Sequence, residues 1–215
     1  MKRNNKLNKA NAYRLSQDVL RNKALSKGVN LIAPETIFLS NDTTFGKNVT
    51  VEPYVVFGPK VKIGDNSHQK YFSHVEVTKI EKNVVVGPYA RLRTGTVLKN
   101  NTKIGNFVET KKTNINQNSK VNHLSYIGDA SIGRNSNIGA GTITCNYDGV
   151  KKSKTKIADN VFIGSNSSLV APIKIEKASV VGAGSVITKN VKKNSLAITR
   201  SSQLEIKNYS NKKKK

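Results

Sequence analysis

The chain has 215 residues, of which 36% are hydrophobic, so it can form one folded domain with a buried core. It has no run of about 18 apolar residues, which excludes a membrane-spanning helix, and its basic first residues lack the apolar segment of a secretory signal. A single cysteine, Cys145, excludes an internal disulfide and fits a reducing cytoplasm.

The formal net charge is +24, from 37 basic and 13 acidic residues. Such a charge is typical of nucleic-acid binding, of a site for an anionic small molecule, or of a solvated surface rich in lysine and asparagine. The basic residues are spread along the chain, with one block at Lys212 to Lys215, and no groove-reading motif is present. Composition leaves these three interpretations open.

The chain begins with a predicted helix over residues 1–28, because Leu15, Val19 and Leu20 lie at helical spacing and Gly28 is suited to its C-terminal end. A repeating segment follows. We expect it over 29–64, with an irregular loop at 65–79, a second repeating stretch over 80–144, an external loop at 145–156, a regular run over 157–191 and a polar tail from 192.

The repeat has a period of six residues. An α-helix repeats near 3.6 and a strand at 2, so this period indicates a short strand and a turn, stacked many times. Glycine often follows the aliphatic residue, where the backbone would turn sharply. The pattern predicts an all-β fold, a parallel β-helix of hexapeptide repeats with a short N-terminal helix; a β-sandwich would show the spacing only by accident. The three aliphatic runs are Leu39, Phe45, Val51, Phe57 and Ile63; Ile80, Val86, Leu92, Leu98 and Ile104; and Ile157, Ile163, Leu169, Ile175, Val181 and Ile187.

The three histidines raise the question of a zinc site, since hexapeptide β-helices include zinc carbonic anhydrases. His68 and His74 fall in the stretch predicted to be irregular, far in sequence from His123. Neither an HxxxxH pair nor a CxxC pair is present, so no metal is expected.

His123 lies in KVNHLSYIGDA, where the period shifts. Stacked coils can bring nearby cations and polar side chains to one wall, where they would suit a phosphate and a sugar. Neutral imidazole, with an unperturbed pKa of about 6.5, is a suitable base for an amine. Cys145 has no histidine within a few residues and is expected to pack or to anchor the external loop. The neighbours of His123 within a coil or two are Arg93, Lys111, Lys112, Tyr126 and Asn137.

From residue 87 onward the sequence contains motifs that are characteristic of one protein family, beyond the general six-residue repeat. The strings GPYARLRTGT, GNFVETKK, NHLSYIGDASIGRNSNIGAGTITCNYDGVKKSKT, IGSNSSLVAP, VGAGSVIT and ITR resemble one family. It is the acetyltransferase half of the bifunctional N-acetylglucosamine-1-phosphate uridyltransferase / glucosamine-1-phosphate N-acetyltransferase. The resemblance covers roughly residues 15–200. It implies a left-handed β-helix and acetyl transfer from acetyl-CoA to the amine of glucosamine 1-phosphate, a step toward UDP-N-acetylglucosamine for peptidoglycan and lipopolysaccharide.

The resemblance also implies roles for individual residues. His123 would be the general base, and Lys152 would meet the phosphate or the adenosine end. Independently of the resemblance, we expect Glu109 to orient His123 or the substrate ammonium group. The sugar phosphate would contact Arg93, Lys111, Tyr126 and Asn137. Acetyl-CoA would contact Ala140, Asn146, Tyr147, Ser165, Ala183 and Arg200.

The same resemblance divides the chain into an interdomain-linker helix (1–28), the acetyltransferase β-helix (29–200) and a basic tail (201–215). It implies a homotrimer. We expect this assembly to be cytoplasmic and to have neither nucleic-acid nor membrane partners. No nucleotide-binding glycine-rich loop is present, so uridylyl transfer is not expected. A non-catalytic scaffold, or an acyltransferase for another amino sugar nucleotide, stays open as an alternative.

Overall fold

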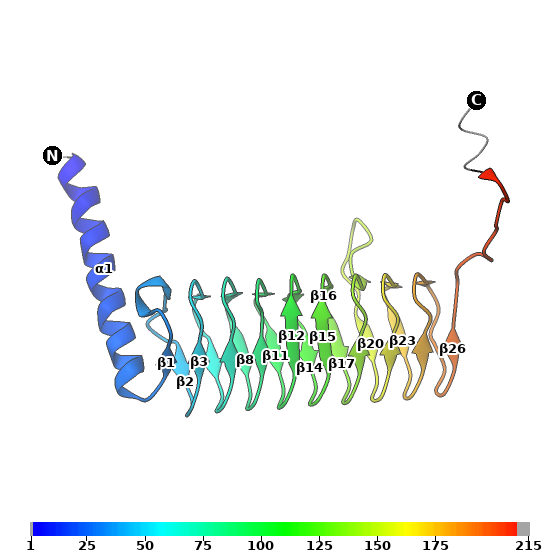
Figure 1. Ribbon diagram of the computed structural model, residues 1–215, viewed down its shortest axis with the longest axis horizontal. Helices are drawn as coiled ribbons and strands as arrows, with labels where there is room; N and C mark the ends of the chain where they lie inside the picture. The colour runs from blue at the N-terminus through cyan, green and yellow to red at the C-terminus, as the bar shows by residue number, and fades with distance from the viewer. Residues whose placement is uncertain (1, 210–215) are drawn as a thin grey trace.

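The computed structural model describes residues 2–209 and shows a long prism of stacked coils (Figure 1). Helix α1 (Lys2–Ser26) lies at an angle against the first coil, and a 3₁₀ turn, η1 (Pro34–Thr36), follows β1. The expected lysine block at 212–215 lies outside the described residues. The class expected from the six-residue period is confirmed: the body is a parallel β-helix.

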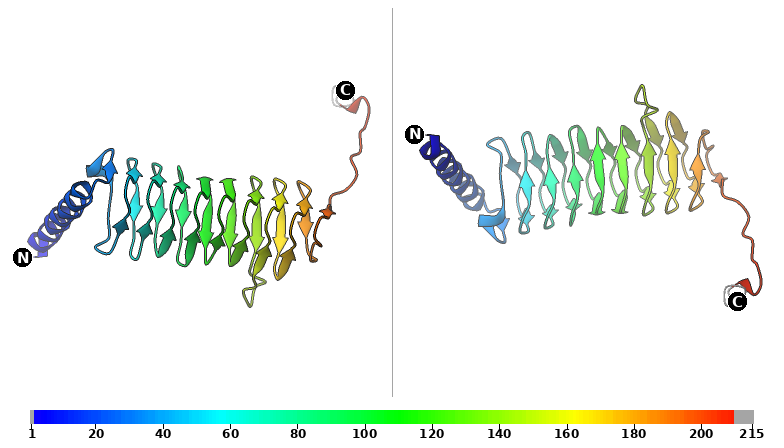
Figure 2. Two further views of the ribbon diagram at one scale, coloured as in Figure 1. Left: turned by 90° about the horizontal axis from the view of Figure 1, so that it is seen from below. Right: turned by 90° about the horizontal axis from the view of Figure 1, so that it is seen from above.

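Three parallel sheets form the walls of the prism, here called A, B and C in the order in which the chain visits them (Figure 2). Wall A contains β1 (Asn30–Leu31), β3 (Thr50–Val51), β6 (His68–Gln69), β9 (Val85–Val86), β12 (Lys103–Asn106), β15 (Lys120–His123), β18 (Asn137–Ile138), β21 (Phe162–Ile163), β24 (Val180–Val181) and β26 (Leu196–Ala197). Wall B contains β4 (Val56–Phe57), β7 (His74–Val75), β10 (Arg91–Leu92), β13 (Glu109–Lys111), β16 (Tyr126–Gly128), β19 (Ile143–Cys145), β22 (Ser168–Val170) and β25 (Val186–Ile187). Wall C contains β2 (Thr44–Phe45), β5 (Lys62–Ile63), β8 (Thr78–Ile80), β11 (Thr96–Leu98), β14 (Asn114–Ile115), β17 (Ala130–Ile132), β20 (Thr155–Ile157) and β23 (Ile173–Ile175).

Each strand turns at least one side chain into the prism, and these side chains stack from coil to coil. On wall A, for example, Val86, Ile104 and Val121 lie in register and are fully buried. The period of six therefore arises because each wall-and-corner unit is six residues long, and the aliphatic member of each unit faces the axis.

The prediction of an irregular loop at 65–79 is wrong. Strands β6 and β7 continue walls A and B there, and β8 begins before the stretch ends. The six-residue period does not reveal this stretch, because its inward residue on wall A is the polar Gln69 and because the next inward aliphatic after Val75 is Ile80, five residues on. Gln69 is fully buried, and neither atom of its amide group has a hydrogen-bond partner in the structure.

The corners of the prism use residues in the left-handed backbone region, one per turn. Between walls C and A this residue is usually asparagine, whose amide tolerates that region, and side-chain hydrogen bonds of 3.0–3.1 Å link Asn83, Asn101, Asn118 and Asn135 in series.

Between walls A and B the left-handed residues are first large and then small. Tyr54, Phe72, Tyr89 and Phe107 stack on one another with ring centroids 4.8–5.1 Å apart, and Leu124 follows. We call these five residues the aromatic ladder. After Leu124 the left-handed residues at this corner are Gly141, Asn166 and Gly184.

The B–C corner alone changes its length. From β2 to β26, the inward residue of a wall A strand and that of the next wall B strand are always six residues apart in sequence, and so are those of a wall C strand and the next wall A strand. The step from wall B to wall C varies, and it is only five residues at Val75–Ile80, Thr110–Ile115 and Ile127–Ile132. It lengthens at the external loop, which protrudes from the prism between β19 and β20 (Figure 1). The expected loop at 145–156 is therefore confirmed.

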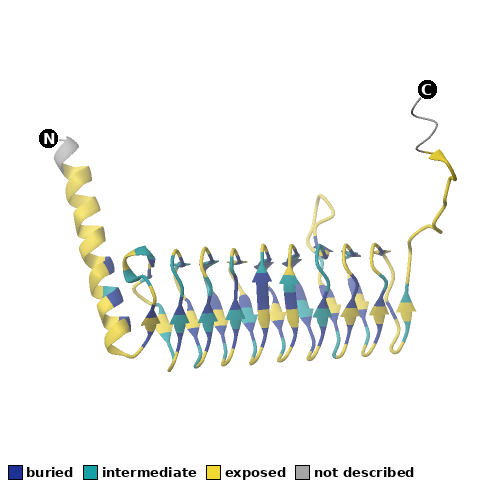
Figure 3. Ribbon diagram, viewed as in Figure 1, coloured by how far each residue is buried: buried dark blue, intermediate teal, exposed yellow. Residues whose placement is uncertain are grey.

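The buried residues of helix α1 lie in its C-terminal half, as the burial colours show (Figure 3), and Tyr13 near its middle stacks on Phe38 of the prism. The buried Gln17 amide accepts from the Leu39 backbone N–H and donates to the Leu39 carbonyl, at 2.8 and 2.9 Å. Ala24 is buried, and Gly28 ends the helix region with φ +81°. Among residues 2–209, neither this helix nor any other combines the length and apolarity needed to cross a bilayer.

Candidate active site

A cluster of three cations lies at the B–C end of wall B. Arg93 follows β10, Lys111 ends the neighbouring strand β13, and Lys152 reaches Lys111 from the external loop. Lys152, and more weakly Arg93, repel the charged form of Lys111 and hold its pKa below the usual value for lysine. This cluster, here called the cation clamp, is suited to an anion with several oxygens, such as a phosphate.

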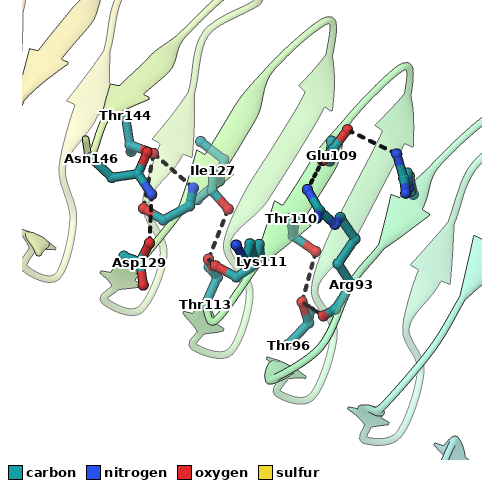
Figure 4. A network of polar contacts seen from close by, with 12 residues as sticks. Arg93, Thr96, Glu109, Thr110, Lys111, Thr113, Ile127, Asp129, Thr144 and Asn146 are labelled. Atoms are coloured by element: carbon teal, nitrogen blue, oxygen red, sulfur yellow. Dashed lines mark hydrogen bonds and ion pairs between the residues drawn. The ribbon is translucent and has the colours of Figure 1, made fainter. Parts of the chain in front are cut away.

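Glu109 fixes the arginine of the clamp. Its carboxylate accepts a 2.6 Å hydrogen bond from Arg93, and Arg91 lies 3.9 Å from its other oxygen (Figure 4). The hydrogen bond to Glu109 raises the pKa of Arg93. The structure therefore assigns Glu109 to the arginines, and the partner of His123 is another residue.

Tyr126 belongs to the same wall. It lies in register with Glu109 on the adjacent strand, and Gly128 lies in register with Lys111. A Cβ atom at Gly128 would come within 2.5 Å of the Tyr126 hydroxyl, so the absence of a side chain there lets the tyrosine ring lie along the wall. The hydroxyl is thereby directed along the strand toward the clamp end of wall B.

His123 lies at the A–B end of wall A, on the last residue of β15, and is exposed. Its Nδ1 is 2.5 Å from Oδ1 of Asn106, the residue in register on β12. Asn137 is also on wall A but at the C–A end, at the start of β18. A single chain thus places His123 and Asn137 on one wall and Arg93, Lys111 and Tyr126 on another.

Four of the residues expected to contact acetyl-CoA lie along the A–B corner of successive coils. They are Ala140, Ser165, Ala183 and Arg200. Ala140 accepts a backbone hydrogen bond from Asn166, and Ser165 accepts one from Gly184, at 2.7 and 2.8 Å. The Arg200 guanidinium donates to the Ala183 carbonyl at 2.8 Å. The left-handed corner residues from Gly141 onward are smaller than those of the aromatic ladder that precede them.

The other two expected contacts, Asn146 and Tyr147, lie at the B–C corner. The Asn146 amide is nearly buried and donates to Asp129, which anchors the start of the external loop (Figure 4). Tyr147 is exposed, pairs with Lys152 across the loop, and donates to the Gly149 carbonyl. Within one chain these two residues are separated from the A–B corner by wall B.

The Asp148 carboxylate closes the external loop. It accepts hydrogen bonds from the backbone N–H groups of Lys151 and Val150, at 2.8 and 2.9 Å, and these bonds hold its pKa below the usual value. This turn fixes the strand pair in which Lys152 stands opposite Tyr147.

Two contacts of the site could not be predicted from the sequence: that between Asn106 and His123, and that between Lys152 and Lys111. Asn106 was missed because its coil is 17 residues long, so its register with His123 does not follow a multiple of six. The contact between Lys152 and Lys111 depends on how the external loop folds back, which no period describes. Lys112, expected among the neighbours of His123, occupies the B–C corner with a left-handed backbone.

The three histidines do not share one wall of one coil. His68 and His74 lie on walls A and B, and His123 lies three strands along wall A from His68. Within the described residues 2–209, His, Cys, Asp and Glu side chains form no group of three that could hold a metal ion.

Comparison with known proteins identifies the repeat and the relatives of this chain. Residues 154–189 match the family described as the hexapeptide repeat of succinyl-transferase. The chain is 50% identical over 216 residues to the bifunctional protein GlmU of Zymomonas mobilis, covering 99% of this chain and 48% of that protein. It is 55% identical over 200 residues to the bifunctional protein GlmU of a Bradyrhizobium strain, covering 93% and 45%. The chain therefore spans about half the length of the curated relatives it matches.

Solved structures show the same fold at much lower identity. The UDP-N-acetylglucosamine acyltransferase of Campylobacter jejuni superposes with a TM-score of 0.68 at 16% identity, over 79% of this chain and 71% of that one. The Francisella novicida enzyme of the same name gives 0.63 at 15% identity, over 75% and 62%. These likenesses support the fold alone.

Proposed function

Because this chain is homologous to the bifunctional GlmU proteins over about half of their length, we propose that it is an acyltransferase that moves the acetyl group of acetyl-CoA to the amine of glucosamine 1-phosphate. The observation that carries the proposal is the cation clamp of Arg93, Lys111 and Lys152, one wall away from an exposed histidine. The product would serve UDP-N-acetylglucosamine synthesis.

The clamp would hold the sugar 1-phosphate. Two of its cations come from adjacent strands and the third from a hydrogen-bonded loop, so their spacing is set before the substrate arrives. Fixing the phosphate positions the 2-amino group and converts a bimolecular encounter into an oriented one. Tyr126, on the same wall, would bind a sugar hydroxyl.

His123 would act as the general base. As the amine nitrogen bonds to the acetyl carbon and the carbon–sulfur bond breaks, the imidazole takes the proton that the amine loses. Such proton transfer contributes about 10²–10⁴-fold in typical enzymes. Acetyl-CoA supplies the activated thioester, and the small half of the A–B corner, with Ala140, Ser165 and Ala183, would carry its extended arm.

A homotrimer would complete this site. If the A–B edges of three prisms point to a common axis, wall A of one copy faces wall B of the next. The C–A end of wall A, with Asn137, then meets the B–C end of wall B, with Lys111 and Arg93. His123, at the A–B end of wall A, meets Tyr126 at the corresponding end of the neighbour. This arrangement joins the two residue groups that one chain keeps apart.

The homotrimer also explains the exposed aromatic ladder, whose side chains would then lie at the axis. Its rings are 43–53% exposed although they stack on one another.

We place the protein in the cytoplasm, since a chain with one cysteine suits a reducing compartment.

The proposal is tested by mixing the protein with acetyl-CoA and glucosamine 1-phosphate and following thiol release. We expect turnover that His123→Ala lowers by at least about 10²-fold with little change in substrate affinity. The same assay with UDP-glucosamine in place of glucosamine 1-phosphate tests the alternative that the protein acts on an amino sugar nucleotide. Folded protein with no thiol release from either amine would contradict the acyltransferase assignment, and turnover of UDP-glucosamine alone would move it to a nucleotide sugar.

A further inference from the structure

Asn106 is the partner of His123 in the structure. The two residues are in register on adjacent strands of wall A, and the Leu124 N–H donates to the Asn106 carbonyl at 3.0 Å immediately beside them. With Oδ1 of Asn106 2.5 Å from Nδ1 of His123, the amide oxygen is placed to accept a hydrogen bond from an Nδ1–H group of the ring.

A neutral imidazole carries one proton, on either nitrogen, and the hydrogen bond made by one nitrogen decides the state of the other. An amide oxygen is an acceptor only. Hydrogen bonding to Oδ1 therefore requires the proton on Nδ1 and leaves the lone pair on Nε2. A base that takes a proton from an incoming amine needs that free lone pair on the nitrogen that faces the substrate.

We propose that Asn106 is a positioning residue that holds His123 in the Nδ1–H tautomer, with Nε2 free to accept the amine proton. The inference rests on the proposed function for its catalytic consequence, but the tautomer itself is a property of the folded protein. Asn106 acts through His123 and needs no contact with the substrate.

The choice of asparagine rather than a carboxylate has a consequence for charge. An aspartate in the same place would stabilise imidazolium and raise the pKa of the base, whereas an amide orients the ring without adding charge. The charged residues on the strands beside His123 are Lys103 on β12 and Lys120 on β15 itself, and β18 contributes the neutral Asn137. An amide partner therefore orients the ring without adding a negative charge beside it.

The tautomer can be read directly. In ¹⁵N-labelled protein, two-bond ¹⁵N–¹H correlations from the imidazole ring distinguish a protonated from an unprotonated nitrogen. Above the pH at which His123 is charged, we expect a protonated Nδ1 and an unprotonated Nε2. In Asn106→Leu the preference should be lost, while kcat falls at least about tenfold and KM for glucosamine 1-phosphate stays within about twofold.

Asn106→Asp separates positioning from simple structural support. It keeps the acceptor and should keep the Nδ1–H tautomer, but the acidic limb of the kcat profile should move to higher pH. Asn114→Asp, an exposed asparagine on wall C, is the matched control and should leave the tautomer and the profile unchanged.

Three results would overturn the proposal: a wild-type His123 protonated on Nε2, an unchanged tautomer and kcat in Asn106→Leu, or an Asn106→Asp profile identical to that of the native protein. If the protein proves inactive with every amine tested, the proposed function fails, yet the tautomer measurement still decides the role of Asn106.

Discussion

Lys111 shows how the clamp prepares for an anion. Its neighbours Lys152 and Arg93 make its own charge less favourable in the free protein, which is why its pKa is lowered. A bound phosphate brings the opposite charge and removes this repulsion. An anionic ligand would therefore bind here more favourably than a neutral ligand of the same shape.

The affinity for glucosamine 1-phosphate should therefore depend on pH. Below the lowered pKa of Lys111 all three cations are present, and the affinity should be constant once the phosphate is fully ionised. As pH rises through that pKa one cation is lost, so Kd should increase at a lower pH than the ordinary lysine value would give. Calorimetric titrations in two buffers of different protonation enthalpy would also detect proton uptake on binding in this range.

Lys111→Gln should weaken binding at neutral pH by about tenfold or more and remove the alkaline dependence. Lys62→Gln, an exposed lysine on wall C, changes the net charge equally and is the matched control. Equal weakening in both variants would assign the effect to overall charge instead of the clamp.

Gln69 is a second residue of interest, because its buried amide lowers the stability of the folded protein. Its fully buried amide lies between Val51 and Val86 on wall A, and neither polar atom has a partner. An unsatisfied buried polar group costs about 1–3 kcal/mol. Gln69→Leu, of similar volume, should therefore raise the melting temperature measured by calorimetry.

Gln117→Leu is the exposed control and should change stability by less than about 0.5 kcal/mol. A lower melting temperature in Gln69→Leu would show that the amide has a partner inside the prism, such as a buried water.

At the scale of the element, the external loop is the part of the site most open to change. It is held by the two bonds to Asp148 and the strand pair of Tyr147 and Lys152. Asp148→Ala removes the turn, so Lys152 should no longer be held near Lys111 and KM for glucosamine 1-phosphate should rise about tenfold. Steady-state kinetics would measure it, and limited proteolysis would report faster cleavage in the loop.

Asp148→Asn is the conservative variant, because its side-chain oxygen can accept the same two hydrogen bonds. It should retain most of the affinity for the substrate. An unchanged KM in Asp148→Ala, with the loop cut more rapidly, would remove Lys152 from the clamp.

The elements themselves were largely predictable from the sequence, because the inward residue of each strand repeats every six positions. The prediction failed at 65–79, where a buried polar residue interrupts the aliphatic series, since a pattern based on hydrophobicity cannot identify an inward glutamine. The partners within the site were harder. Asn106 next to His123, and Glu109 next to the arginines, depend on coil lengths of 17 or 18 residues, which only the three-dimensional register reveals.

At the scale of the whole molecule, the decisive prediction is assembly. Light scattering after size exclusion should give three times the 23.5 kDa chain mass. Phe107→Asp, in the exposed aromatic ladder, should dissociate the trimer and abolish activity, because charge would be placed at the shared axis. Val97→Asp, on the outward wall C, should leave the mass unchanged. A monomeric native protein that retains full activity would rule out the composite site.

The B–C corner, which alone varies in length, also has an evolutionary meaning. In the proposed trimer this corner is the outer rim of each subunit, so residues gained or lost there disturb neither the axis nor the stacking of inward side chains. The A–B corner lacks that freedom in the proposed trimer because it lies at the shared axis, and the C–A corner keeps its six-residue step from β2 to β26. We expect lineages of this protein to acquire new recognition loops almost exclusively along this rim, as its longest loop, which carries Lys152, already illustrates.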